Sequence, residues 1–238
     1  MREIPKSIPI LLTVMFLLFT AAVVLFGKPS EPTVPNQTPV SPGSTSNVRM
    51  NGLSESDQVS SVTSESGDGS NFVPPFALAN ERVTKKPFGI FITKAASPVQ
   101  PERFSGYHTG TDFEVFPDET DTDVGVSAIC DGTLLMKRSA SGYGGVAVQS
   151  CAYDGRPITV VYGHLRLSSI RVKVGEPIAA GDFLGNLGAG YSLETDGERK
   201  HLHLGIHRGD IVDIRGYVTT VRQMSDWMDP YELIHSQQ

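Results

Sequence analysis

The sequence has few cysteines and no surplus of positive charge, and each shortage excludes a class of protein. Two cysteines in 238 residues cannot form a disulfide-rich scaffold or a zinc site of four thiolates. Twenty basic residues against 26 acidic ones give a net charge of −6. That balance argues against a nucleic-acid-binding protein, which needs a basic surface to meet phosphates. No internal repeat is present either.

One long apolar run lies near the N-terminus. Residues 8–26 carry no charge, and a helix of that length spans roughly 28 Å, close to a hydrocarbon core of about 30 Å. A cleaved signal peptide is the alternative, but its apolar region is usually shorter and ends in a small-x-small site. We therefore expect an uncleaved transmembrane signal-anchor helix over residues 8–27.

Positive charges set the expected orientation of this helix. Arg2 and Lys6 precede the apolar run, whereas Lys28 alone follows it closely. By the positive-inside rule, residues 1–7 form a short cytoplasmic end and the remainder of this single-pass membrane protein lies outside the cytoplasm.

The next segment, residues 28–75, consists largely of Pro, Ser, Thr and Gly, with Phe72 as its one aromatic residue. Such a segment buries too little apolar area to offset its chain entropy, so we expect a disordered linker.

From residue 76 the composition changes to short β-branched and aromatic runs separated by Gly, Asp and Ser. This pattern predicts a mainly β domain over residues 76–238, with antiparallel, sandwich-like sheets. A strand is expected at residues 170–174 among others, and a short helical pattern occurs at residues 224–234.

Four of the six histidines lie in short β-like segments. His108 and Asp112 are four residues apart, His201 and His203 are two apart, and His164 follows a strand-like run. On a strand, both spacings place side chains on one face. The helical H-E-x-x-H motif is absent. Two imidazoles and a carboxylate are a common zinc-binding set that leaves a fourth position for water.

Either pair alone is weak, because such pairs also occur by chance on solvated strands. In this chain order, however, the motifs resemble peptidase family M23, the lysostaphin-like or LytM-type zinc metallopeptidases that cut cell-wall peptides. The resemblance covers about residues 85–235. It rests on H-x3-D at 108–112, A-x-x-D-G at 128–132, G-x-G at 142–144, Y-x-H-L at 162–165, H-L-H at 201–203 and D-P at 229–230.

The resemblance implies that His108, Asp112 and His203 bind one zinc ion, with His164 and His201 as the catalytic pair. It implies a metallopeptidase domain with a groove. The chain would then be a membrane-tethered zinc metalloendopeptidase that hydrolyses peptidoglycan stems or cross-bridges with a zinc-activated water. The alternative is a non-catalytic module of the same fold that binds cell-wall material or activates an amidase. The complete set of five residues argues against it.

The chain departs from the family pattern around the H-L-H motif. Residues 192–200 are longer and more charged than the usual segment, and Leu204 and Gly205 replace an aromatic and an acidic residue. We expect these changes to affect the groove wall and the choice of substrate rather than the metal ligands. We interpret His207 as a rim residue and His235 as part of a frayed tail, both without a role in the site.

The two cysteines flank a predicted hairpin whose turn lies near residues 140–143. In such a hairpin Cys130 and Cys151 would face each other on adjacent strands, within disulfide range. An oxidising compartment outside the membrane would close the bond. Two buried free thiols are the alternative.

Overall fold

The computed structural model describes residues 72–235. The predicted membrane helix and nearly all of the predicted linker therefore lie outside the described residues. Within residues 72–235, no helix is both long and apolar enough to cross a membrane. Phe72 is already buried, and the Val73 amide donates to the Ile129 carbonyl, so the folded domain begins before the predicted boundary at residue 76.

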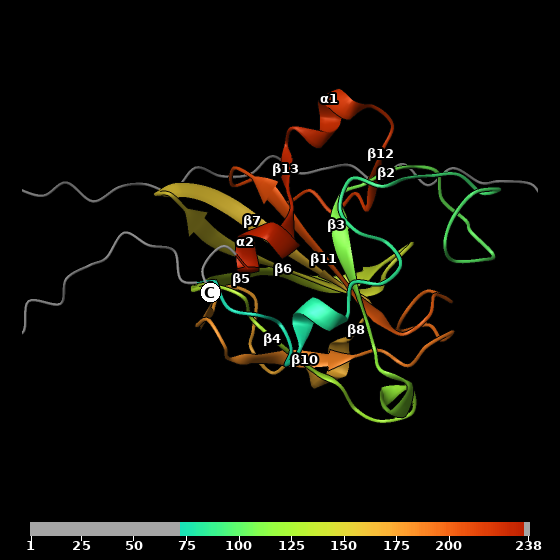
Figure 1. Cartoon of the computed structure of the whole chain (residues 1–238). Coiled ribbons are helices and arrows are strands. Elements are labelled where there is room, and N and C mark those ends of the chain that lie inside the picture. Colours follow the sequence, from blue (N-terminus) through green and yellow to red (C-terminus); the bar gives the residue numbers. More distant parts are fainter. Residues whose placement is uncertain (1–71, 236–238) are drawn as a thin grey trace, which may run out of the picture. The chain divides into compact units, whose positions relative to one another are not determined.

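The domain is mainly β, as predicted, and its sheets are antiparallel. The largest sheet has seven strands. They are β3 (Gly110–Glu114), β5 (Gly132–Ala140), β6 (Gly144–Tyr153), β7 (Arg156–Gly163), β9 (Pro177–Ile178), β11 (His201–Arg208) and β13 (Trp227–Met228). The order is β13-β11-β7-β6-β5-β9, and β3 shares one edge of β11 with β13 (Figure 1).

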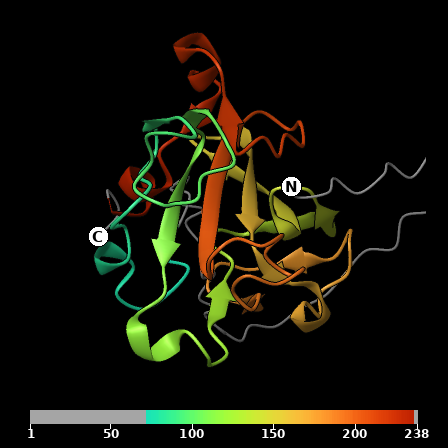
Figure 2. The ribbon, with the colours of Figure 1, turned by 90° about the vertical axis from the view of Figure 1, so that its right-hand side faces the viewer.

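Two three-stranded sheets and a few short helices complete the domain. One sheet contains β1 (Phe91–Ile92), β2 (Gly106–His108) and β12 (Tyr217–Val218), and the other contains β4 (Gly125–Ser127), β10 (Phe183–Leu187) and β8 (Leu165–Arg166). The α-helices are α1 (Val221–Met224) and α2 (Pro230–His235), and the 3-10 helices are η1 (Ala79–Glu81), η2 (Pro117–Glu119) and η3 (Leu167–Ser169). Figure 2 shows β3 in green beside β11 in orange-red.

The main core lies on one face of the large sheet. Leu202 and Leu204 of β11 are fully buried there, together with Leu184 of the β4-β10-β8 sheet. Each such side chain stabilises the fold by about 1.5–3 kcal/mol. His201 and His203 alternate with these leucines and line a cavity on the opposite face. The predicted alternation of β11 is therefore confirmed.

Two local predictions are wrong. Residues 170–174 form no strand, because the Lys137 ammonium donates to the carbonyls of Ile170 and Val172 and takes the place of a strand partner. The helical pattern at residues 224–234 is interrupted by β13, and α2 begins at Pro230. A proline at the first helical position is favourable, whereas the preceding residue is driven out of helical conformation.

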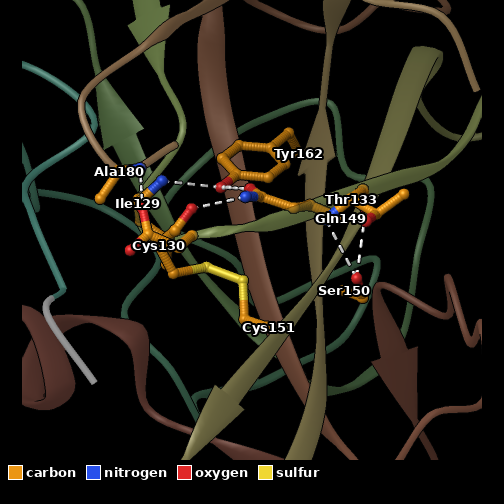
Figure 3. The surroundings of a disulfide bond; sticks show 9 residues. Ile129, Cys130, Thr133, Gln149, Ser150, Cys151, Tyr162 and Ala180 are labelled. Atoms are coloured by element: carbon orange, nitrogen blue, oxygen red, sulfur yellow. Dashed lines mark hydrogen bonds between the residues drawn. A yellow bond between two sulfur atoms is a disulfide. The ribbon is translucent and has the colours of Figure 1, made fainter. Parts of the chain in front are cut away.

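A disulfide joins Cys130 to Cys151, with a Cα–Cα distance of 6.2 Å. The hairpin of β5 and β6 turns where predicted, but Cys130 lies in the bend before β5 rather than on the strand. Figure 3 shows the contacts beside the bond: Gln149 Nε2 donates to the Cys130 carbonyl at 2.6 Å, and the Tyr162 hydroxyl donates to Gln149 Oε1 at 2.8 Å. Through Gln149, these two hydrogen bonds connect the backbone of Cys130 to Tyr162 of β7.

Candidate metal centre

The register between β3 and β11 brings two short motifs together. His203 pairs with Asp112, and His201 pairs with Glu114. Residues that face each other across an antiparallel pair project from the same side of the sheet. The H-L-H segment therefore shares a face with the two carboxylates of β3.

His108 reaches this face from a different sheet. The extended segment is interrupted at Thr109, whose amide donates to the Gly216 carbonyl. β2 and β3 are therefore separate strands. The prediction that His108 and Asp112 share one strand is wrong, although the side chains still meet. Gly110 allows β3 to lie close to β11: a Cβ at residue 110 would lie 2.4 Å from the Leu204 carbonyl oxygen and 2.8 Å from His203 Nε2.

Three donor atoms converge at the centre. His108 Nε2 lies 3.0 Å from His203 Nδ1, and Asp112 Oδ1 lies 3.2 Å from each of them. Ligand atoms on a tetrahedral zinc ion with bonds of about 2.0–2.1 Å stand about 3.3 Å apart. His108 Nδ1 donates to the Pro87 carbonyl at 3.2 Å, which leaves the lone pair on Nε2. These three residues could therefore hold a metal ion.

Burial and charge set the protonation of two of these side chains. Burial alone would raise the pKa of Asp112, but the charges of His201 and His108 and hydrogen bonds to them hold it well below its usual value. Burial lowers the pKa of His203 to about 4. At neutral pH the carboxyl is ionised and the His203 imidazole is neutral, which are the forms that bind metal.

His164 and His201 lie beside the three donors. Their ring centroids are 4.2 Å apart. His201 Nδ1 donates to the Arg199 carbonyl at 2.9 Å, so in the neutral imidazole the lone pair is on Nε2, which lies 3.3 Å from Asp112 Oδ2. His164 lies between β7 and β8 with a φ of +64°, a left-handed conformation that costs a side-chain-bearing residue about 1–3 kcal/mol. Burial lowers the pKa of His164 well below its usual value.

A cavity of about 450 Å³ opens over these histidines, in agreement with the predicted groove. Its lining includes two residues that sequence reasoning did not assign to the site, Tyr143 and Arg199. The Tyr143 ring lies 5.3 Å from that of His203, and its buried hydroxyl has no hydrogen-bond partner among residues 72–235. The glycines on either side of Tyr143 have positive φ, and they were the only signal for it in the sequence.

The charged segment at residues 192–200 forms part of the cavity wall, as expected. Arg103 Nε contacts Glu198 Oε1 at 2.9 Å, and Arg103 Nη2 contacts Asp196 Oδ2 at 3.2 Å. Asp196 Oδ2 also accepts from the Gly142 amide at 2.7 Å. The expectation that this segment stays clear of the ligands is wrong, because Arg199 Nη2 lies 2.8 Å from Asp112 Oδ2.

The two remaining histidines do not line the cavity. His207 is buried against Trp227, with ring centroids 4.9 Å apart, so the prediction of a rim position is wrong. His235 is the last residue of α2, where its Nδ1 bonds to the Tyr231 carbonyl, rather than part of a frayed tail.

Residues 106–214 match the model of peptidase family M23, and this range contains His108, Asp112, His164, His201 and His203. The segment is an M23 peptidase domain. This range contains the motifs on which the sequence resemblance rests, apart from D-P at 229–230.

Several solved structures are similar to this M23 domain, whereas no curated protein matches the chain. The catalytic domain of the antimicrobial peptidase lysostaphin from Staphylococcus simulans has a TM-score of 0.45 and 21% identity, over 66% of this chain and 95% of that one. The structure of cbpa from L. salivarius REN has a TM-score of 0.44 and 23% identity, over 71% and 97%. A zinc-containing peptidase from Vibrio cholerae has a TM-score of 0.39 and 21% identity, over 58% and 37%.

Proposed function

We propose that this chain is a membrane-tethered zinc metalloendopeptidase that hydrolyses peptide bonds in peptidoglycan stems or cross-bridges. The observation that carries the proposal is the triangle of His108 Nε2, Asp112 Oδ1 and His203 Nδ1, with sides of 3.0–3.2 Å, two of whose residues, Asp112 and His203, line the cavity. A zinc ion held by these atoms supplies Lewis acidity, which polarises a peptide carbonyl and lowers the pKa of water.

His201 is the proton acceptor in this proposal. In the neutral imidazole Nε2 carries the lone pair, because Nδ1 donates to a backbone carbonyl. Nε2 takes a proton from the attacking water and later delivers it to the leaving amine. The Asp112 carboxylate, 3.3 Å away, stabilises the positive charge that forms on the imidazole.

His164 and Tyr143 assist at the carbonyl oxygen. His164 lines the cavity, where its Nε2 donates to the developing negative charge. Burial raises the pKa of Tyr143, so its hydroxyl stays protonated at neutral pH and offers a second donor.

The apolar run at residues 8–27 supplies the membrane tether, with the N-terminus in the cytoplasm and the peptidase domain outside. The Cys130–Cys151 disulfide supports this location, because such bonds persist in oxidising compartments. Peptidoglycan peptides are the substrate that the family resemblance implies.

The test compares zinc content and peptide release in purified full-length protein. We expect one zinc per chain in the wild type, with fragments of defined peptidoglycan identified by mass spectrometry. His108→Ala should lose the zinc. His201→Ala and His164→Ala should keep it and lose about 10²–10⁴-fold in rate.

His207→Ala is the matched control, because His207 is also a buried histidine of β11 but does not line the cavity. It should retain both zinc and activity. Equal zinc loss in all three site variants would show that the division of roles is wrong. A zinc-loaded wild type that releases no fragments would instead favour the non-catalytic module.

A further inference from the structure

Arg199 makes an unusual set of contacts for a residue on a cavity wall. Its side chain is only 8% exposed. Nε lies 3.0 and 2.9 Å from the two oxygens of Glu114, and Nη2 contacts Asp112 Oδ2 at 2.8 Å and Glu114 Oε1 at 2.5 Å. The guanidinium therefore joins the two carboxylates that β3 presents on the face of the proposed metal centre.

The two oxygens of Asp112 are divided between different partners. Oδ1 lies 3.2 Å from His108 Nε2 and from His203 Nδ1, within the triangle of donor atoms. Oδ2 accepts from Arg199 instead. With Oδ2 engaged, Asp112 offers a single oxygen to an ion at the centre of the triangle.

We propose that Arg199 is a positioning residue that fixes Asp112 as a one-oxygen metal ligand, with Glu114 holding the guanidinium in place. The inference rests on the proposed metal site. Hydrogen-bond partners behind a ligand orient it and tune its affinity for the metal. If Oδ2 were released, Asp112 could bind through both oxygens and take up the position that a catalytic zinc site leaves open.

The contacts require the shape of a guanidinium as well as its charge. The planar fork bonds Glu114 through Nε and Nη2 while Nη2 also reaches Asp112, so one rigid group sets both distances. The ammonium of a lysine is a compact point charge on a flexible stem. Arg199→Lys should therefore preserve the charge balance and lose the positioning.

The test measures zinc affinity in the full-length protein by competition with a chromophoric chelator. We expect Arg199→Lys and Arg199→Gln to bind zinc about 10- to 100-fold more weakly than the wild type. Glu114→Gln should weaken binding in the same direction, because it loosens the guanidinium. Arg103→Gln is the matched control: Arg103 also bridges two carboxylates, but it lies away from the donor triangle, and its variant should bind zinc as the wild type does.

A second measurement reports the coordination number of the bound metal ion. With cobalt(II) in place of zinc, a four-coordinate site absorbs visible light more strongly than a five-coordinate one. Arg199→Lys should therefore show weaker visible bands than the wild type and Arg103→Gln. Trp227 fluorescence identifies any variant that fails to fold, and if Arg199→Gln unfolds, the lysine and Glu114→Gln variants carry the test.

The outcomes separate this inference from the proposed function. Unchanged affinity and an unchanged cobalt spectrum in folded Arg199→Lys would overturn the positioning role, whatever the activity. A wild type that binds zinc and cuts no peptide would end the peptidase proposal alone. A wild type that binds no zinc would overturn both.

Discussion

Replacing Tyr162 by Phe tests how the strand end that leads to His164 is held. The Tyr162 hydroxyl is fully buried, donates to Gln149 Oε1 at 2.8 Å and accepts from the Ile129 amide at 2.9 Å (Figure 3). Phenylalanine keeps the ring but leaves a buried acceptor and a buried donor without a partner. Each such group costs about 1–3 kcal/mol, so we expect the free energy of unfolding to fall by about 2–6 kcal/mol.

The assay is urea unfolding of the metal-free protein, followed through Trp227. This residue is the single tryptophan of the chain and is only 3% exposed, so its emission reports loss of the fold. The urea midpoint should fall while the slope stays constant. Tyr191→Phe is the control, because Tyr191 is 81% exposed, and it should change stability by less than about 0.5 kcal/mol. A Tyr162→Phe variant as stable as this control would refute the reasoning.

The remaining predictions use the same unfolding assay or zinc content. Replacing Cys130 and Cys151 by Ala should lower the free energy of unfolding by up to about 3 kcal/mol, given their separation of 21 residues; an unchanged midpoint would contradict this. Between pH 6.5 and about 4 the proton that His203, whose folded pKa is about 4, takes up on unfolding should lower the stability of the metal-free protein by about 3 kcal/mol, and His164, whose pKa burial also lowers, should add to the loss; a flat midpoint would count against this. Gly110→Ala should lower the free energy of unfolding and bind less zinc, since its methyl group would lie 2.4 Å from the Leu204 carbonyl oxygen and 2.8 Å from His203 Nε2; unchanged stability with full zinc content would show that the strand adapts.

The parts of the site that depend on local spacing could be predicted from the sequence. Alternation placed His201 and His203 opposite Leu202 and Leu204, and the structure confirms both faces of β11. The strand-rich pattern predicted the β5–β6 hairpin and the cysteine pairing, although Cys130 proved to lie before the strand.

The parts that depend on register could not be predicted. Glu114 faces His201 only because β3 and β11 pair in one register out of several, and Arg199 reaches Asp112 across 87 positions of sequence. The error at residues 170–174 has a similar origin. A β-branched run predicts a strand, but the Lys137 side chain from a distant strand satisfies the carbonyls instead.

The proposed ligands come from two different sheets, with a mechanical consequence. His108 belongs to β2 of the β1-β2-β12 sheet, whereas Asp112 and His203 belong to the seven-stranded sheet. An ion bound by all three side chains is therefore also a cross-link between the sheets. It stabilises the fold by about 2.7 kcal/mol when free ion stands at 100 times its Kd. Without bound metal the domain would then be less stable as well as inactive. It should also be cut faster by proteases when little zinc is available.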